Sequence, residues 1–572
     1  MTLFEKILFL KPVISRLFQL LNKRQKLLMV PMLVVIIGFS LVETVGISAI
    51  MPFISIVSDT SLLDGGLYKQ IFVFFGFSSA ETFIIAFGIC IIFFYLFRGI
   101  YFIFLQYITI RYSNSIYKYY SKNVLKISLT VPYKAHSQKN TGEMMHAIFN
   151  ETREVGNTVL HFLNFCTELF TILLVYSLIV ILDWKMTLSI TVILFLIVTI
   201  LLSFITKRNY VQGKTRFKTG RKMNRILKES LGNLKFIKLK NNEERIIEKY
   251  NDALDLNTKS LLNSNVLGAM PKGILESNGF SFLMGVIVFI VWNSNDASTV
   301  IPIISMYALA LYRILPSTHR VLFEIGKIVN NEEFTKNVYD SMQQTTENEG
   351  AEPLNFNNTI RLENVHFQYM TGPEIIKNIS LEIKKGEKVA FTGESGCGKS
   401  TLIDIITGIH KPISGKVLID DSVLTNKNIR SWRHKIGYIP QSIYLFDGTV
   451  AENVIFGSIY DEQKITSALN KANIWDFLSQ KEGINTLVGD GGIQLSGGQQ
   501  QRICIARAIY DDPEVLVLDE ATSSLDIETE QKIMDEIYNV STNKTLLVIA
   551  HRLTTVERCD RRIRIENGAI AF

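Results

Sequence analysis

Gly393-Glu394-Ser395-Gly396-Cys397-Gly398-Lys399-Ser400 is the stretch that decides the fold of the second half of this 572-residue chain. It matches the pattern G-x-x-x-x-G-K-[ST] at every fixed position. A short apolar run, Lys388–Thr392, precedes it, and a helical pattern follows from Thr401. Strand, glycine-rich loop and helix form a cradle in which backbone N–H groups and the helix N-terminus bind phosphate oxygens. We therefore expect an α/β domain of the P-loop class here.

The residues of this cradle have separate predicted roles. Lys399 is expected to reach the β- and γ-phosphates of a nucleotide, and Ser400 to hold Mg²⁺. ATP and Mg²⁺ are therefore the expected cofactors. The predicted phosphate-binding set is Gly393, Glu394, Ser395, Gly396, Cys397, Gly398, Lys399, Ser400 and Thr401.

Two adjacent carboxylates follow a second strand pattern, Val515–Leu518. The carboxyl end of a parallel strand is where open α/β sheets bind their ligands. Asp519 is the predicted metal ligand. Glu520 is the predicted catalytic residue that polarises the attacking water, since hydrolysis needs an acceptor for the water proton. A solvated turn is the alternative interpretation, and the nearby glycine-rich loop weakens it.

The first half of the chain carries nearly all of the long uncharged stretches of a sequence that is 48% hydrophobic, with 36 Phe. A spanning helix needs about 20 mostly apolar residues. The candidate spans are Leu27–Val57, Thr82–Ile110, Val159–Leu182, Trp184–Ile205, Ile274–Trp292 and Ala297–Leu315. The fold class that we expect is an all-α six-helix transmembrane domain followed by the α/β P-loop domain.

Lys and Arg residues gather in the long connections after the second and fourth candidate spans. Such a bias places these connections and both termini on the cytoplasmic side. It also accounts for the net charge of +7 without a nucleic-acid partner. Because these connections are poor in Pro and Gly, we expect helices that continue beyond the membrane.

Four regions follow from this pattern. Residues 1–26 read as an amphipathic segment at the inner interface, with a plain cytoplasmic tail as the alternative. Residues 27–340 are the expected transmembrane domain, 341–358 a polar linker, and 359–572 the nucleotide-binding domain. The five cysteines show no metal-ligand spacing and are expected as reduced thiols.

Charged side chains inside the apolar stretches are costly and usually face a cavity or a partner. Two interpretations stay open for Arg98 and Arg313: they line a cavity and bind an anionic substrate, or they pair with Glu43 or Glu168. The first outer loop, residues 58–80, is rich in apolar side chains. It either contacts lipid or packs against the outer ends of its own helices.

Leu495-Ser496-Gly497-Gly498-Gln499, followed by Gln500-Gln501-Arg502, resembles the signature motif of ABC ATPases. The order of the glycine-rich loop, Gln441, this motif, Asp519 and His551 resembles that family too. The resemblance implies that Ser496, Gly497, Gly498 and Gln499 of one subunit complete the ATP site of another. A homodimer with an isologous interface is therefore expected.

The same resemblance implies roles for single residues. Tyr369 would stack on adenine, although an aromatic residue in a strand is common without any ligand. Gln441 would join Ser400 and Asp519 near the metal, and His551 would contact the γ-phosphate as a second catalytic residue. The resemblance also implies a D-loop at 523–526, and elements that couple the two domains within 132–138 and 231–239.

The order of the two domains resembles the exporter branch of the ABC family. Segments Glu43–Phe53, Phe236–Lys240 and Ala308–Ser317 are similar to those of bacterial flippases for lipid-linked oligosaccharides in protein glycosylation. This implies a polyprenyl-pyrophosphate glycan as cargo at the bacterial inner membrane. The candidate ligands of its pyrophosphate are Arg98, Lys272 and Arg313, because an Arg fork matches phosphate oxygens.

Two alternatives to this cargo stay open. One is an exporter of another amphiphile, such as lipid A, a peptide or a drug. The other is a non-transport ABC ATPase that acts in DNA repair or translation, and the apolar spans argue against it.

Overall fold

The computed structural model describes residues 3–58, 60–136, 140–182, 184–293, 301–369, 372–519, 527–550 and 556–571. The chain divides into two compact units. Unit 1 comprises Met1–Leu129 and Lys139–Gln344, and unit 2 comprises Thr130–Gln138 and Thr345–Phe572. The short segment Thr130–Gln138 therefore belongs with the second unit, although both of its neighbours in sequence belong to the first.

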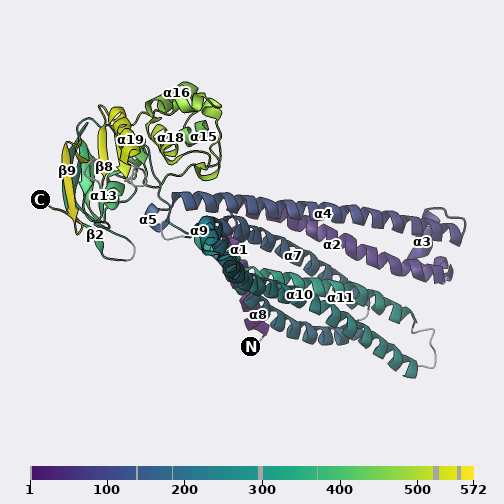
Figure 1. Ribbon diagram of the computed structural model, residues 1–572. Helices are drawn as coiled ribbons and strands as arrows, with labels where there is room; N and C mark the ends of the chain where they lie inside the picture. The colour runs from purple at the N-terminus through teal and green to yellow at the C-terminus, as the bar shows by residue number, and fades with distance from the viewer. Residues whose placement is uncertain are drawn as a thin grey trace. The chain divides into compact units, whose positions relative to one another are not determined.

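Unit 1 is helical throughout its described residues (Figure 1). Its elements are α1 (Leu3–Leu20), α2 (Lys23–Ser58), η1 (Thr60–Asp64), α3 (Gly66–Phe74), α4 (Ala80–Thr130), α6 (Thr141–His146), the π-helical turn η2 (Ala147–Glu151), α7 (Thr152–Leu182), α8 (Trp184–Leu231), α9 (Leu234–Lys240), α10 (Glu243–Asn293), α11 (Ile301–Asn330) and α12 (Glu332–Met342).

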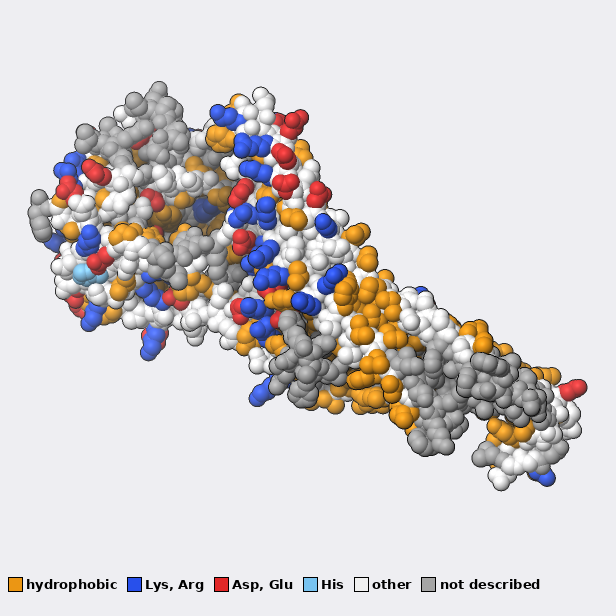
Figure 2. Space-filling view, turned by 90° about the horizontal axis from the view of Figure 1, so that it is seen from below, with side chains coloured by type: hydrophobic (Ala, Val, Ile, Leu, Met, Phe, Trp, Pro, Cys, Tyr) orange, Lys and Arg blue, Asp and Glu red, His pale blue; other side chains and the backbone are white. Residues whose placement is uncertain are grey.

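Four helical stretches of the described chain are long and apolar enough to cross a membrane: Lys23–Val57, Ala80–Thr130, Thr141–Ile181 and Leu194–Leu231. They coincide with the first four predicted spans. The fifth predicted span lies in α10, and the sixth begins outside the described residues and continues in α11. Hydrophobic side chains cover one stretch of the helical unit, and charged side chains gather on the adjoining stretch (Figure 2).

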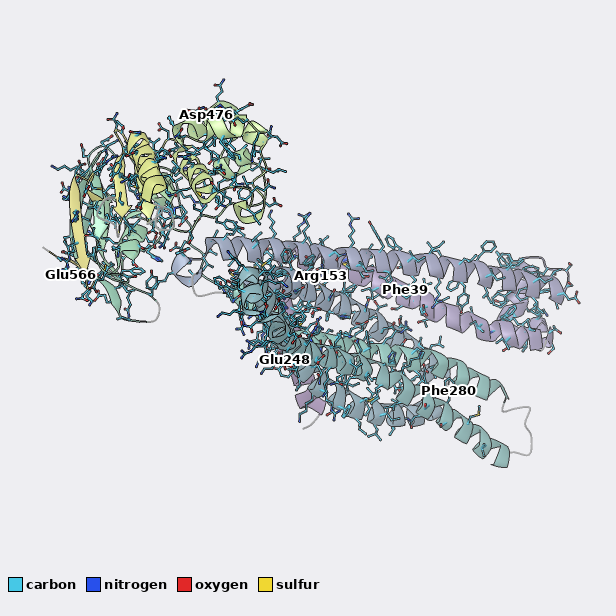
Figure 3. All side chains as sticks on the ribbon, in the orientation of Figure 1. Phe39, Arg153, Glu248, Phe280, Asp476 and Glu566 are labelled. Carbon is cyan, nitrogen blue, oxygen red and sulfur yellow. The ribbon has the colours of Figure 1, made fainter. Side chains whose placement is uncertain are left out.

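Helices α4, α8 and α10 continue beyond the predicted spans, as the low Pro and Gly content of the long connections predicts. Helix α4 has 51 residues and therefore measures roughly 75 Å, against a hydrocarbon core of about 30 Å. Along the helices Phe39 and Phe280 lie on the apolar stretches, whereas Arg153 and Glu248 lie on the charged parts (Figure 3). These extensions carry the basic residues on which the predicted orientation of the unit rests.

A buried polar network joins the inner ends of the helices. Glu151, at the end of the π-helical turn, is fully buried. It accepts a hydrogen bond from Arg221 at 2.8 Å and one from Asn337, and it lies 3.0 Å from Nδ1 of His146. A buried carboxylate is stable only when it is paired in this way, so the network fixes α8 and α12 against the turn.

The apolar outer loop divides its side chains between two environments. Leu63 is buried with Ile56 and Phe83 of the neighbouring helices, and Phe72 and Phe77 pack on them. The loop therefore packs against the outer ends of its own helices, as one of the two interpretations holds. Its other face carries the exposed run Val73–Phe75 at the end of α3, in which Phe74 is 84% exposed.

Helix α1 packs its apolar face onto the rest of unit 1. Val13, Leu17 and Leu21 are buried, and Leu17 and Leu21 share a core cluster with Val338 of α12. Arg16 also pairs with Glu332 at 3.2 Å. The segment is thus a docked helix, and its contact with the membrane surface stays a prediction.

Unit 2 contains two sheets. One has the strand order β2-β1-β4-β5 and is antiparallel, and the other has the order β10-β9-β3-β8-β7-β6. The strands are β1 (Thr359–Gln368), β2 (Glu374–Lys384), β3 (Lys388–Thr392), β4 (Ser414–Ile419), β5 (Ser422–Val423), β6 (Ile436–Ile439), β7 (Val515–Asp519), β8 (Thr545–Ile549), β9 (Arg561–Glu566) and β10 (Ala569–Ala571).

Two core clusters stabilise unit 2. The first lies between the sheets around α13 (Lys399–Ile406) and α14 (Ile429–Arg433), and it contains the fully buried Trp432, which donates to the Ile406 carbonyl at 2.8 Å. The second joins strands β6–β8 to a group of helices. These helices are α15 (Val450–Ile455), α16 (Glu462–Lys471), α17 (Trp475–Ser479), α18 (Gly497–Ile509) and α19 (Ile527–Val540).

Gly213 lies at a close contact between two helices of unit 1. A Cβ at this position of α8 would lie 1.9 Å from the backbone oxygen of Asn330 in α11. We expect Gly213→Ala to lower the thermal midpoint Tm of the purified protein, because overpacking costs about 1–3 kcal/mol. In the matched control, Gly273→Ala in α10, the added Cβ meets nothing within 4 Å. That control should leave Tm unchanged or raise it, and a Gly213→Ala Tm at or above wild type would contradict the contact.

Candidate functional site

The parallel strands of unit 2 bring the predicted site residues to one edge. Strands β9, β3, β8, β7 and β6 are parallel neighbours. The glycine-rich loop follows β3, Asp519 ends β7, and Gln441 follows β6. Because carboxyl ends of parallel strands share an edge, these three groups lie on the same side of the sheet.

Gly393 allows the loop to lie against the neighbouring strand. Its φ of 145° is open only to glycine, and a Cβ there would lie 2.3 Å from the carbonyl oxygen of Ile565 in β9. The backbone thus approaches β9 more closely than any side chain permits. The turn then leads directly into α13, whose first residue is Lys399.

Lys399 is held ready inside the loop. Its ammonium donates to the carbonyl oxygens of Gly393 and Glu394, at 2.9 Å each, and the residue is buried. Two carbonyl oxygens therefore accept the hydrogen bonds of the Lys399 ammonium that phosphate oxygens would accept in a nucleotide complex. Ser400, one residue further on α13, is exposed and its hydroxyl is accessible to a cation.

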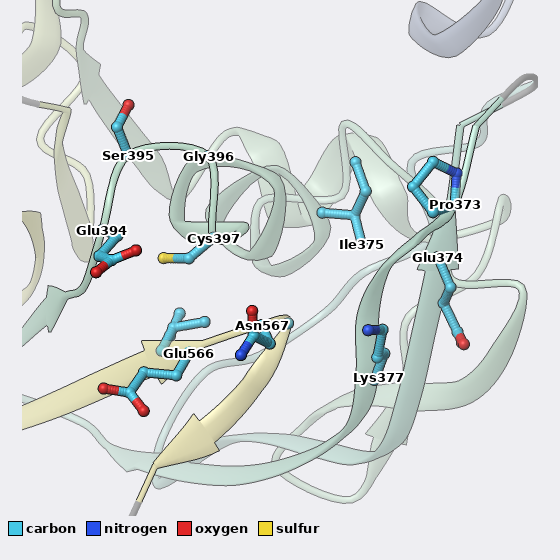
Figure 4. Close-up of a pocket in the computed structure, with 12 residues that line it drawn as sticks. Pro373, Glu374, Ile375, Lys377, Glu394, Ser395, Gly396, Cys397, Glu566 and Asn567 are labelled. Atoms are coloured by element: carbon cyan, nitrogen blue, oxygen red, sulfur yellow. The ribbon is translucent and has the colours of Figure 1, made fainter.

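A cavity of about 550 Å³ opens beside the loop (Figure 4). Its lining includes Glu394–Cys397 of the loop, Pro373 and Ile375 at the start of β2, and Glu566 and Asn567 at the β9–β10 turn. The volume is within the range of small-molecule sites. Glu394–Cys397 of the predicted loop therefore line this cavity, whereas Lys399, Ser400 and Asp519 do not.

Asp519 sits in an acidic pair at the carboxyl end of β7. Tyr438 of β6 donates its hydroxyl to Oδ2 of Asp519 at 2.8 Å. Burial, and then the charge of Asp519, raise the pKa of Asp404 in α13 to about 6. Burial, and then the hydrogen bond to Asp519, also raise the pKa of Tyr438. Two carboxylates that repel each other in a half-buried place are ready to accept a cation.

Tyr369 belongs to an aromatic wall beside α13. Its hydroxyl lies 3.3 Å from the hydroxyl of Thr401, and its ring contacts those of Phe367 and His410 at 5.1 and 5.4 Å. The residue is partly exposed, so a flat ligand can reach it. This places the predicted adenine-stacking residue next to the predicted phosphate cradle.

The signature residues lie at the start of α18. Ser496 is the N-cap of this helix, and it forms a capping box with Gln499. Gly497 and Gly498 are the first two residues of the helix. None of the four lines the cavity beside the glycine-rich loop. Within one chain, therefore, the two motifs belong to different parts of unit 2.

Several predicted residues fall outside what the structure describes. Glu520, His551 and the segment 523–526 are not among the described residues. Arg313 lies in α11, but its side chain is likewise not described. Their roles stay predictions.

A second cavity, of about 320 Å³, lies in unit 1 among charged side chains. Arg98 of α4 donates to both carboxylate oxygens of Glu43 in α2, from Nε at 2.7 Å and from Nη2 at 2.5 Å. Arg320 pairs with Glu168 at 3.1 Å, and His161 lies 2.5 Å from Glu324. Arg98 thus both lines a cavity and pairs with Glu43, which joins the two interpretations left open by the sequence.

The other predicted substrate ligand, Lys272, is exposed on α10 and does not line this cavity. It acts electrostatically on His319 together with Arg320 and Glu276. Sequence reasoning did not identify Arg320, Glu324 or His161, although a charged residue every few positions in an apolar helix is the signal that would find them. It also missed Asp404 and Tyr438, for which the sequence offers no signal.

Asp404 makes the stability of the folded protein depend on pH. Its pKa rises from 3.8 to about 6 on folding, so the folded state binds the proton more tightly than the unfolded state. The charged carboxylate therefore destabilises the protein above about pH 6, and this cost disappears as the pH falls towards 3.8. We expect Asp404→Asn to raise Tm at pH 8, without nucleotide and Mg²⁺, by more than it does at pH 5.

Thermal unfolding at the two pH values measures this difference. The matched control is Asp421→Asn, which removes the same charge from an exposed position. It should change Tm equally at both pH values. An Asp404→Asn gain at pH 5 that equals the gain at pH 8 would disprove the assignment.

Comparison with known proteins places these two units in one family. Residues 27–314 match the family model of the ABC transporter transmembrane region, and residues 376–523 match that of the ABC transporter. A bacterial Atm1-family ABC exporter with ATP bound is similar in fold, with a TM-score of 0.77, 22% identity, and coverage of 96% of this chain and 94% of the other. The predicted combination of a helical transmembrane domain and an α/β ABC domain is thus confirmed.

Curated relatives give the same result. The ATP-dependent lipid A-core flippase of Burkholderia pseudomallei (strain 1710b) is 33% identical over 353 residues, which cover 60% of this chain, and the chain spans 59% of that relative's length. The protein of the same name from Paraburkholderia xenovorans (strain LB400) is 30% identical over 447 residues, which cover 76% of this chain and 74% of the relative. This chain is therefore a multi-pass membrane protein and belongs to the ABC transporter family.

Proposed function

We propose that this protein is an ATP-driven exporter that flips a lipid-linked, phosphate-bearing molecule, a polyprenyl-pyrophosphate oligosaccharide, across the bacterial inner membrane. The observation that carries the proposal is the Arg98 guanidinium, which lines a cavity inside an apolar helical unit of a chain that also holds a nucleotide cradle. Positive charge at that depth is costly and therefore indicates a site that handles polar substrate.

The cradle residues supply the chemistry of hydrolysis. Lys399 exchanges its two carbonyl partners for β- and γ-phosphate oxygens. A bound Mg²⁺ would neutralise charge on these phosphates, held by Ser400 and Asp519 with Gln441 nearby. This small protein ligand set fits Mg²⁺, which keeps several waters and binds phosphate oxygens as well. Glu520 orients the attacking water and His551 contacts the γ-phosphate.

Two copies of the chain form the working unit in this proposal. The signature residues at the start of α18 belong to a different part of unit 2 from the glycine-rich loop of their own chain, so we assign them to the ATP site of a second copy. Helix α9 supports the same conclusion. Leu234, Phe236 and Leu239 are all exposed on it although it lies among basic side chains, and a patch of this kind marks an interaction surface.

The cavity of unit 1 contains a guanidinium that can bind an anionic lipid headgroup. The two hydrogen bonds of Arg98 use Nε and Nη2, and within the described part of the chain Nη1 makes none. Glu43, which is almost fully buried, fixes the orientation of the guanidinium, and Nη1 can donate a hydrogen bond to a phosphate oxygen. Arg98 is thus held in place by Glu43 and can still bind an anion.

Charge balance requires further cations for a pyrophosphate. The cavity lining holds the guanidiniums of Arg98 and Arg320 against the carboxylates of Glu43, Glu168 and Glu324. We assign the additional positive charge to Arg313 of α11, because Lys272 of α10 does not line this cavity. The exposed face of α3, with Phe74 and Phe75, would contact the lipid tail at the outer side.

A second candidate is the export of a different amphiphile. The relatives named as lipid A-core flippases favour this alternative, since they too are named for a lipid cargo. A peptide or a drug belongs to the same class. All of these share the ATP-driven mechanism and differ only in what the cavity binds.

Reconstitution in liposomes with a labelled lipid-linked oligosaccharide tests the cargo. We expect ATP-dependent protection of the glycan from an external cleaving enzyme, and we expect no protection with Glu520→Gln. Parallel liposomes that contain lipid A-core separate the two candidates. Protection of lipid A-core alone, with normal ATP hydrolysis, would reject the oligosaccharide and retain the exporter.

The role of Arg98 is tested by removing the whole ion pair. Glu43→Gln/Arg98→Gln leaves no lone buried charge, so the protein should fold and hydrolyse ATP while transport falls about 10-fold or more, the effect of losing a charge-assisted hydrogen bond of roughly 1.5–3 kcal/mol. The control Arg111→Gln removes an exposed charge from the same helix. Transport that survives neutralisation of both Arg98 and Arg313 would remove the electrostatic basis of this cargo.

A further inference from the structure

Helix α5 (Tyr133–His136) contacts the aromatic wall beside the nucleotide cradle. It lies in the segment Thr130–Gln138, which is part of unit 2 although it follows helix α4 directly in the chain. The Tyr133 ring lies 5.7 Å from that of His410. Lys134 donates to the carbonyl oxygen of Gln368 at 2.6 Å and lies 5.3 Å above the Phe367 ring.

His410 is the centre of this wall. It is 3% exposed, stacks on Phe367 at 4.9 Å and 25°, and contacts Tyr369 edge-on at 5.4 Å and 87°. Burial, and then the charge of Lys134, lower the pKa of His410, so the ring is neutral at physiological pH and packs as an aromatic group. Tyr133 thus reaches Tyr369 through a single intervening ring.

Tyr133 is also close to the acidic end of the site. Its phenol acts electrostatically on Tyr438, which donates to Asp519. Oδ2 of Asp404, the carboxylate that repels Asp519, lies 3.9 Å from Nε2 of His410. Through His410, Tyr133 is thus connected both to Tyr369 and to Asp404.

We propose that Tyr133 is a positioning residue of the nucleotide site, which holds the His410 ring against Tyr369 and thereby sets how strongly the protein binds the adenine ring. The proposal rests on the ATP site of the proposed function. Neither Phe367 nor His410 stacks in parallel with Tyr369, because both contacts are nearly perpendicular at 85° and 87°. The face of the Tyr369 ring can therefore stack in parallel with a flat base. The orientation of this ring sets the free energy of that stacking contact.

A consequence follows for the chain that carries Tyr133. The segment is covalently continuous with α4, one of the helices apolar enough to span the membrane. Displacement of α5 removes Tyr133 from His410, so the affinity for adenine falls without any change in the glycine-rich loop. The binding of the adenine base can thus be weakened while the binding of the phosphates by the glycine-rich loop is unchanged.

The test compares ATP with tripolyphosphate, which has the same phosphate chain and no base. Both are measured on the full-length purified protein with Mg²⁺, by competition with a fluorescent ATP analogue. We expect Tyr133→Ala to weaken ATP binding about 2- to 12-fold, the loss that corresponds to an aromatic pair of roughly 0.5–1.5 kcal/mol. Tripolyphosphate binding should not change, and Tyr133→Phe, which keeps the ring, should behave as wild type.

A second variant keeps the test independent of the folding of Tyr133→Ala. His410→Leu should produce the same selective loss, and the double variant should lose no more than the larger single loss, because both changes break one chain of contacts. Equal weakening of ATP and tripolyphosphate, or additive losses, would overturn the proposal. A wild-type protein that does not bind ATP would overturn the proposed function itself, which is a different result.

Discussion

A peptide group without a hydrogen-bond partner in hydrocarbon costs several kcal/mol, and the first unit of this protein is organised by that cost. Its apolar segments satisfy their backbone internally as helices, and α4, α8 and α10 extend the same pattern far into the charged region. Polar side chains then have to be satisfied between helices. The Glu151 network and the Glu43–Arg98 pair are the places where this is done.

Two acidic places in the molecule follow opposite rules. Glu43 and Glu168 lie at membrane depth, and each is matched by a guanidinium, so that neither charge is left alone in a low-dielectric environment. Asp404 and Asp519 repel each other instead, and burial raises the pKa of Asp404 further. The first arrangement pairs each carboxylate with a guanidinium, whereas the second places two carboxylates so that they repel each other. The second arrangement is the one that would take the Mg²⁺ of the proposed function.

The sequence was sufficient for whatever depends on neighbours in the chain. The glycine-rich loop, its strand and its helix were predictable because Lys399 and Ser400 lie within eight residues of Gly393. Apolar length likewise predicted the first four spans. The sequence could not decide whether Arg98 pairs with Glu43 or with Glu168, because that depends on how each helix is rotated about its axis. Asp404 and Tyr438 approach Asp519 only through the sheet order, which no local pattern encodes.

The uninterrupted length of α4 gives it the properties of a lever. A helix of 51 residues, roughly 75 Å long, bends little under small loads, so a tilt of only about 5° around one end moves the other by about 6 Å. That distance exceeds the 5.7 Å between the Tyr133 and His410 rings at the point where the chain leaves α4. In the proposed arrangement, a small tilt of α4 would therefore be enough to separate the Tyr133 ring from the His410 ring.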